Sequence, residues 1–224
     1  MPTVLITGAG RGLGEEFVTQ FMEDGWDIIA TCRNPDDIKD TISLEKIDIF
    51  PLDVTSIGSV SDLKSKLCDR PIDVLINNAG IIGQRDGFGA LDYKAWANAM
   101  DTNVFGPMRV AEALVTNVLN SNRKQMIFIT SKMGSITETS PNAYVYRSSK
   151  AALNMAVKCM SLELADKGLT AVLFHPGHVQ TDMGGASAPV TPQLSIAGMK
   201  KQILGFNQKN NGEFLSYDGS SIPW

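Results

Sequence analysis

Two side chains that could together transfer a proton, Tyr146 and Lys150, stand four residues apart in the sequence. The run after Lys150 repeats apolar residues at spacings of three and four, which predicts a helix with both side chains on one face. A phenol ordinarily keeps its proton up to a pH of about 10, but a neighbouring ammonium lowers the pKa of the phenol. The pair could therefore act as a general acid near neutral pH. The alternative is a tyrosine that packs a helix end beside a solvated lysine.

A glycine-rich turn lies between the first predicted strand, residues 4–7, and a helical pattern that closes at Gly25. In this setting the N–H groups of a helix N-terminus bind phosphates, and glycines let the backbone come close to them. The spacing is not that of the usual dinucleotide fingerprint, because position 13 is a leucine. The candidate cofactor-binding residues of this turn are Gly8, Gly10, Arg11, Gly12, Leu13 and Gly14.

The second predicted strand, residues 27–32, is followed by Arg33 instead of a carboxylate. An acidic residue in this place binds the ribose 2′-hydroxyl of NAD, whereas an arginine attracts the 2′-phosphate of NADP. Arg11 in the glycine turn could reach the same group. We therefore expect NADPH in preference to NADH; the alternative is that Arg33 is a solvated loop residue.

Further strands are predicted over residues 47–52, 72–76, 126–131 and 171–175, and helical patterns separate them. This alternation predicts an α/β fold: a single doubly wound Rossmann domain over residues 1–224, with a parallel sheet of six to seven strands and helices on both faces. Ligands bind at the carboxyl ends of such strands. The candidates at these ends are Asp53, Val54, Asn77, Ala79, Gly80 and Ser131. Asp53 could meet an adenine edge or cap the turn and helix after Thr55.

Two segments near the end of the chain have a distinctive composition. A Gly-, Ala-, Ser- and Pro-rich stretch begins the segment of about residues 182–205, which we interpret as a lid over a substrate or, alternatively, as a surface loop. Residues 212–224 contain three aromatic side chains, so we expect this tail to dock on the body of the protein or on another subunit.

Composition excludes several classes of function. A net charge of −4 argues against nucleic-acid binding. The three cysteines lack CxxC spacing and only two histidines are present, so no metal site is expected. No apolar run approaches the roughly 18 residues of a membrane helix, and we expect no signal peptide because the N-terminus runs directly into a strand. A cytoplasmic protein fits these features.

Taken together, these motifs resemble those of the short-chain dehydrogenase/reductase family over nearly the whole chain. The resemblance implies that Asn103, Ser131, Tyr146 and Lys150 form the catalytic tetrad. Tyr144 lies two residues before Tyr146, but only Tyr146 has a lysine four residues later. The segment of residues 176–181 resembles the family stretch that binds the nicotinamide end, which implies cofactor contacts for Pro176, Gly177, Val179 and Thr181.

A closer similarity is to the Sniffer-type carbonyl reductases and the C-factor proteins, carried by residues 181–189 and by the tail. It implies NADPH-dependent reduction of an aldehyde, ketone or quinone by hydride transfer, with Tyr146 as the acid, Ser131 bound to the same oxygen, Lys150 on the ribose and Asn103 holding a water. The alternative is a C-factor-like signalling or nucleotide-sensing protein on the same fold. The family also implies a homodimer or homotetramer that joins through the long helices after Asn98 and Tyr146.

Overall fold

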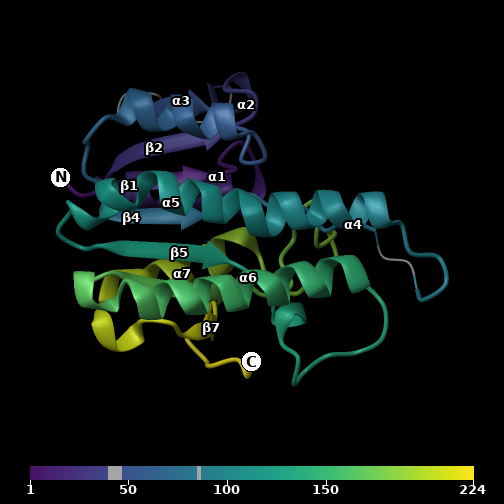
Figure 1. Ribbon diagram of the computed structural model, residues 1–224. Helices are drawn as coiled ribbons and strands as arrows, with labels where there is room; N and C mark the ends of the chain where they lie inside the picture. The colour runs from purple at the N-terminus through teal and green to yellow at the C-terminus, as the bar shows by residue number, and fades with distance from the viewer. Residues whose placement is uncertain (40–46, 85–86) are drawn as a thin grey trace.

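A seven-stranded parallel sheet in the order β3-β2-β1-β4-β5-β6-β7 forms the centre of the molecule (Figure 1). The computed structural model describes residues 1–39, 47–84 and 87–224. This open sheet, with helices on both sides, confirms the fold class expected from the sequence. The strands are β1 (Thr3–Thr7), β2 (Asp27–Cys32), β3 (Ile47–Pro51), β4 (Val74–Asn77), β5 (Gln125–Ile129), β6 (Thr170–His175) and β7 (Phe214–Ser216).

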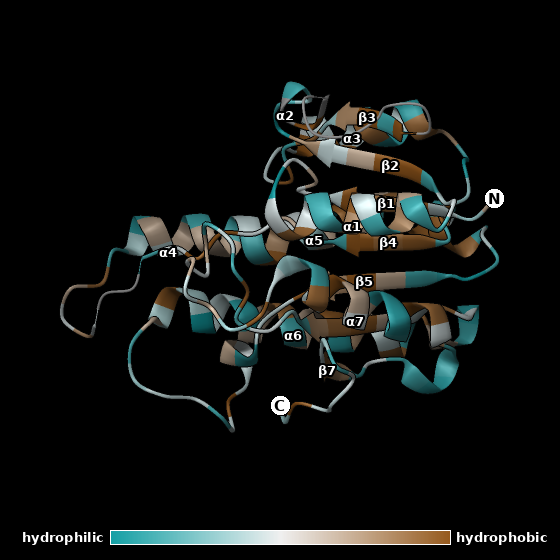
Figure 2. Cartoon of the chain, turned by 180° about the vertical axis from the view of Figure 1, so that it is seen from behind, coloured by the Kyte–Doolittle hydropathy of each residue, from teal (hydrophilic) through white to brown (hydrophobic). Residues whose placement is uncertain are grey.

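Helices cover both faces of the sheet. On one face lie α3 (Ile57–Leu67), α5 (Gly106–Leu119) and α6 (Tyr144–Glu163), which are in front of the sheet in Figure 1. On the other lie α1 (Gly12–Glu23) and α7 (Pro192–Gly205), which come to the front in Figure 2. The short helix α2 (Asp36–Lys39) follows β2, and α4 (Tyr93–Met100) extends past the carboxyl edge of the sheet.

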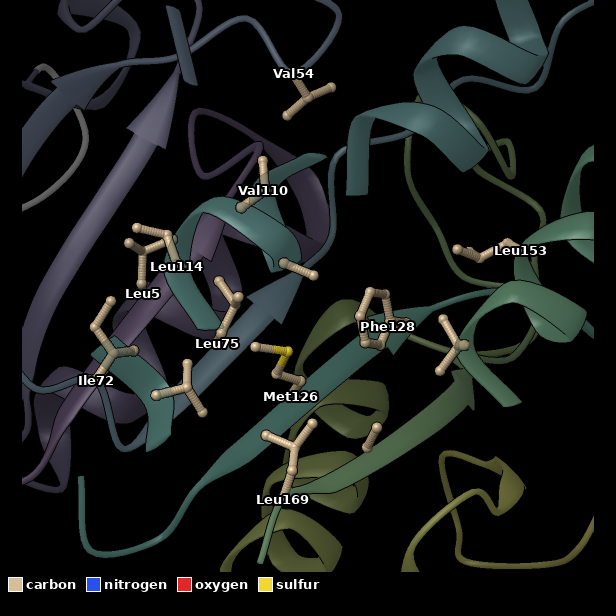
Figure 3. Packing of buried hydrophobic residues seen from close by; sticks show 14 of the residues in the cluster. Leu5, Val54, Ile72, Leu75, Val110, Leu114, Met126, Phe128, Leu153 and Leu169 are labelled. Carbon is tan, nitrogen blue, oxygen red and sulfur yellow. The ribbon is translucent and has the colours of Figure 1, made fainter. Parts of the chain in front are cut away.

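Each face of the sheet has its own hydrophobic core, because successive side chains of a strand point to opposite sides. Leu5, Leu75 and Phe128 pack against α5 and α6 in one cluster (Figure 3). Val4 and Ile6 join the cluster on the opposite face, beneath α1 and α7. The strands are buried on both sides, which explains why they read as continuous apolar runs in the sequence.

The strand order reverses direction beside β1, which pairs with β2 on one side and with β4 on the other. The connections after β1 and β4 leave the sheet in opposite directions there, and this opens a crevice at the carboxyl edge. Ligands of open α/β sheets bind in such a crevice.

Two elements differ in detail from the sequence prediction, and a third agrees with it. The fifth strand ends at Ile129, so Ser131 lies beyond it and caps the short 3₁₀ helix η2 (Lys132–Gly134). The long helical region after residue 92 is interrupted by a π-helical turn, η1 (Asp101–Phe105). The aromatic tail docks on the body of the protein, one of the two expected alternatives, and supplies β7, which pairs parallel with β6. Parts of two predicted segments, residues 40–46 and 85–86, lie outside the described residues.

Candidate active site

Gly14 lets helix α1 begin directly against the end of β1. A Cβ atom on Gly14 would lie 2.0 Å from the main-chain oxygen of Gly8 and 2.8 Å from Nδ2 of Asn78. No larger residue fits there without a shift of the backbone. Gly8 has a φ of +67°, in the left-handed region that favours glycine. The turn is therefore closely packed at its base.

Asn78 ties the ends of β1 and β4 together beside this turn. Its Nδ2 donates to the main-chain oxygens of Thr7 (2.9 Å) and Gly8 (3.1 Å). Thr7 completes the link, because its Oγ1 accepts the main-chain N–H groups of Asn78 and Ala79. Asn77, the neighbouring candidate from the sequence, is buried, and its amide finds no hydrogen-bond partner among the described residues.

A cavity of about 740 Å³ opens along the carboxyl ends of the first four strands. Its volume is within the range of cofactor sites. It brings together many of the residues singled out from the sequence: Gly8, Gly10, Arg11, Gly12, Leu13, Arg33, Asp53, Val54, Ala79, Gly80 and Thr181. The remaining candidates do not line it: Gly14, Asn77, Asn103, Ser131, Tyr146, Lys150, Pro176, Gly177 and Val179.

Asp53 faces this cavity while one of its oxygens caps the turn after β3. Oδ1 accepts the N–H (2.9 Å) and the Oγ1–H (2.7 Å) of Thr55. These hydrogen bonds, with the side-chain bond the stronger cause, lower the pKa of Asp53 below its usual range. The two roles considered from the sequence are therefore compatible.

Two arginines flank the outer end of the cavity, with different surroundings. Arg33 follows β2 and is exposed at the cavity wall. Arg11 reaches across the mouth to Asp182, with 2.5 Å between Nη1 and Oδ2. Both side chains of this ion pair are largely exposed. Arg11 therefore links the glycine turn to the loop that precedes α7.

Lys150 is buried at the inner end of the site. Its Nζ donates to the main-chain oxygen of Ile129, 2.9 Å away, at the end of β5. Burial lowers the pKa of Lys150 to about 8, so the group is still mainly an ammonium at neutral pH. Nζ lies 5.7 Å from the ring centroid of Tyr146. The helix spacing thus places the cation against the phenol ring.

Asn103 is fully buried in the π-helical turn, a type of helix insertion that often occurs at functional sites. Its Oδ1 accepts the N–H of Ile81, and its Nδ2 donates to the oxygen of Ile81 and to Oγ of Ser149. Ser149 Oγ in turn donates to the main-chain oxygen of Tyr146. The Asn103 amide therefore joins the segment after β4 to α6.

Gly80 marks the point at which these groups meet the cavity. A Cβ atom there would lie 3.2 Å from Oδ1 of Asn103 and 3.5 Å from Nζ of Lys150. Gly80 also lines the cavity. The side chains of Asn103 and Lys150 are therefore separated from the cavity only by Gly80, which has no side chain.

Ser131 is buried two residues after Ile129, the acceptor of Lys150. Its Oγ accepts the N–H of Met133 at 3.1 Å. The hydroxyl hydrogen finds no acceptor within residues 1–39, 47–84 and 87–224, so it is available to a ligand. Tyr146 is 8% exposed and Tyr144 is 36% exposed, which separates the two tyrosines as the sequence spacing did.

The segment after β6 runs from the sheet edge to the cavity mouth. A Cβ atom on Gly177 would lie 3.2 Å from the ring of Tyr217, so Gly177 is packed against the tail, while the main-chain oxygen of Pro176 accepts a hydrogen bond from Ser195 of α7. Val179 is buried, and Thr181 lies 3.5 Å from the place where a Gly12 Cβ would be. Of this segment, only the part from Gln180 onward reaches the cavity.

The geometry agrees with the comparisons to known proteins. Residues 2–190 match the family model for short chain dehydrogenases. The chain belongs to the short-chain dehydrogenase/reductase family. The C-signal protein of Myxococcus xanthus is 43% identical over 161 residues, which are 71% of this chain and 97% of that protein.

Solved members of the family have the same fold over the whole chain. The carbonyl reductase Sniffer of D. melanogaster superposes with a TM-score of 0.93 at 32% identity, covering 100% of both chains. An NADPH-bound carbonyl reductase from chicken fatty liver has a TM-score of 0.92 at 30% identity, covering 100% of this chain and 99% of that chain. The similarity to Sniffer-type reductases and C-factor proteins expected from the sequence is confirmed.

Several residues that line the cavity were not predicted from the sequence. Asn78 is the clearest case, because nothing in the local pattern distinguishes it from Asn77. Successive side chains at the end of β4 point to opposite sides, so only one of the two asparagines can face the cavity. Which one does so depends on the register of the strand. The other cavity residues not predicted are Cys32, Leu52, Thr55, Ile81, Asn98, Thr102, Gln180 and Asp182.

Two negative findings hold for the part of the chain that the structure describes. No group of histidine, cysteine or acidic side chains there is arranged to hold a metal ion. No helix within those residues combines the length and apolar character needed to cross a bilayer.

Proposed function

We propose that the protein is an NADPH-dependent reductase that converts an aldehyde, ketone or quinone carbonyl to an alcohol. The observation that carries this proposal is the position of Lys150 and Asn103, which meet behind Gly80 at the inner end of a dinucleotide-sized cavity. Tyr146 lies in the first turn of α6 with Nζ of Lys150 5.7 Å from its ring centroid, and Ser131 is buried two residues after Ile129, whose main-chain oxygen accepts a hydrogen bond from Lys150.

The residues present fit NADP(H). The glycine turn offers helix N-terminal N–H groups to the pyrophosphate, and Arg33 with Arg11 would bind the 2′-phosphate. Asp53 and Val54 would face the adenine, while residues 176–181 would bind the nicotinamide end. When bound, the cofactor supplies the hydride for the carbonyl carbon.

Tyr146 provides the proton in this proposal. Its phenol O–H protonates the carbonyl oxygen as negative charge develops there, and the Lys150 ammonium stabilises the phenolate that remains. The free O–H of Ser131 donates a hydrogen bond to the same oxygen and fixes its position. Lys150 keeps two further N–H donors besides the one used by Ile129, which suits a ribose hydroxyl.

Asn103 supports this arrangement through its contacts. Its side-chain amide is hydrogen-bonded to Ile81 and Ser149, so it joins the segment after β4 to α6. The water-binding role expected from the family resemblance stays a prediction.

The decisive experiment compares Tyr146→Phe with the matched variant Tyr144→Phe. We expect Tyr146→Phe to reduce the rate of carbonyl reduction by roughly 10²–10⁴, the usual effect of losing a general acid, with NADPH affinity nearly unchanged. The rate is read from NADPH oxidation at 340 nm with aldehydes, diketones and quinones. Tyr144→Phe should keep wild-type turnover. Equal turnover in both variants would contradict the assignment.

The identity with the C-signal protein favours one second candidate, a signalling or nucleotide-sensing protein on this fold. A sensor needs no proton donor, whereas this chain keeps a buried Tyr146 and a buried Lys150. Tight NADPH binding without NADPH consumption across the carbonyl panel would favour the sensor.

We further propose that the chain forms a homodimer or homotetramer. Met155 and Leu162 on α6 are 64% and 67% exposed, and the exposed Cys159 lies between them. Their spacing places them on one face of the helix, which gives an apolar stripe that a second subunit would cover.

The free thiols of Cys68 and Cys159 fit the reducing cytoplasm, where we place the protein.

A further inference from the structure

The loop of residues 132–143 connects Ser131 to α6, where Tyr146 lies in the first turn. In the proposed reaction both side chains contact one carbonyl oxygen, so this loop forms a wall of the substrate space. Its first part is locked onto α6, because a Cβ on Gly134 would lie 2.9 Å from the main chain of Lys150. At its far end the loop is held by Arg147 of α6, which donates to Oγ of Ser140 and to the main-chain oxygen of Asn142. The part between these two attachments, residues 135–139, has a further support.

That support comes from Trp224, about ninety residues away in the sequence. The main-chain oxygen of Trp224 accepts three hydrogen bonds, from the N–H (3.0 Å) and Oγ1 (2.8 Å) of Thr137 and from Oγ of Ser135 (3.3 Å). Ser135 Oγ also accepts the N–H of Glu138. The main-chain oxygen of Trp224 therefore accepts one main-chain N–H and two side-chain hydroxyl groups of the loop.

Trp224 is itself held by the body of the protein. Its ring packs against Phe214 of β7, with 5.7 Å between ring centroids, and Nζ of Lys158 lies 5.5 Å above it. Lys158 also donates to the oxygen of Gly212. The preceding residues run back along β7, where the N–H of Ile222 donates to Phe214. The tail is thus anchored to β7 and to α6, the helix that carries Tyr146.

We propose that Trp224 is a positioning residue, which holds the loop of residues 135–139 so that Ser131 and Tyr146 meet the same carbonyl oxygen. This inference rests on the proposed function. Trp224 and this loop do not line the described cofactor cavity. The effect should therefore fall on the carbonyl substrate and spare the cofactor.

The test compares Trp224→Ala with the conservative Trp224→Phe. We expect Trp224→Ala to raise KM for the carbonyl substrate about tenfold, since more than one hydrogen bond loses its fixed acceptor, with Kd for NADPH within twofold of wild type. Hydrogen exchange at the Thr137 amide, measured without ligand, should accelerate. Trp224→Phe should restore both values. Faster exchange with an unchanged KM would overturn the positioning role.

A milder variant protects the test against misfolding. Thr137→Val removes only the Oγ1 donor, so we expect KM to rise about threefold. Thr116→Val on α5 is the matched control, because Thr116 is exposed, lies outside this loop, and its hydroxyl bonds to no described residue; it should change nothing. An equal KM in both threonine variants would also overturn the proposal.

The proposed function fails if the wild type consumes no NADPH with any carbonyl. In that case hydrogen exchange at the Thr137 amide alone reports whether Trp224 holds the loop.

Discussion

Burial changes the acid–base behaviour of two residues near the carboxyl edge of the sheet. Desolvation lowers the pKa of Lys150 to about 8 and that of His175 to about 4. Lys150 faces the proposed reaction centre, whereas Nδ1 of His175 is buried with no hydrogen-bond partner among the described residues. The charged groups that act on His175 are Lys132, Asp218, Glu138 and His178, all weaker in effect than its burial.

We predict that His175 makes the protein less stable in acid. The folded state holds a neutral imidazole down to a pH of about 4, while the unfolded chain takes up the proton near pH 6.5. The unfolded state therefore binds more protons between these values, and the free energy of unfolding falls as the pH drops through this window. Between pH 7 and 4.5, His175→Gln should lose about 2 kcal/mol less than wild type in urea unfolding.

The control for this measurement is His178→Gln, which removes an exposed imidazole from the same segment. It should retain most of the loss of stability in acid, because His175 and its burial remain. If His175→Gln loses as much stability as wild type, another group titrates in this range and His175 is not the cause.

Among the elements, the segment expected as a lid over residues 182–205 divides in two. Its second half is helix α7, whose Ile196, Met199 and Ile203 are buried in the core on the α1 side. Only the loop before α7 lies over the glycine turn, where Asp182 pairs with Arg11. We therefore restrict the proposed lid to this loop.

We predict that Asp182→Asn tightens NADPH binding. The substitution removes a negative charge at the cavity mouth and releases Arg11, which we propose for the 2′-phosphate. The pair is exposed, so the gain should be modest, a two- to fivefold lower Kd for NADPH by fluorescence titration. Asp166→Asn, an exposed aspartate beyond the amino end of β6, is the control. An equal gain for NADH would show that Arg11 does not bind the 2′-phosphate.

At the scale of the whole molecule, α5 and α6 lie on the same face of the sheet (Figure 1). The apolar stripe of Met155, Cys159 and Leu162 runs along the outer side of α6, while Leu153 and Val157 of the same helix are buried in the core. Exposed apolar side chains on the outer side of such a helix favour a second partner that covers them.

We predict that this stripe joins two subunits. The double variant Met155→Lys/Leu162→Lys should convert a wild-type oligomer into a monomer in size-exclusion chromatography with light scattering, because two charges cannot be buried there unpaired. Ile57→Lys, which changes an equally exposed apolar residue on α3, should leave the mass unchanged. A monomeric wild type would contradict the proposed oligomer.

The sequence by itself determined the features that depend on local pattern. The apolar runs and the helical spacing predicted the alternating fold, and the spacing of Tyr146 and Lys150 predicted their contact. Buried strands and helices carry such patterns because each residue's environment repeats with the period of the element. The glycine turn could be read for the same reason, since it joins two recognisable elements.

Only the tertiary structure decided which distant groups meet. It placed Asn78 instead of Asn77 at the cavity, paired Arg11 with Asp182, and brought Trp224 to the loop beside Ser131. These contacts join residues from different parts of the chain, and they depend on strand register and loop path. No local periodicity records them, because the two partners of each contact are far apart in the sequence.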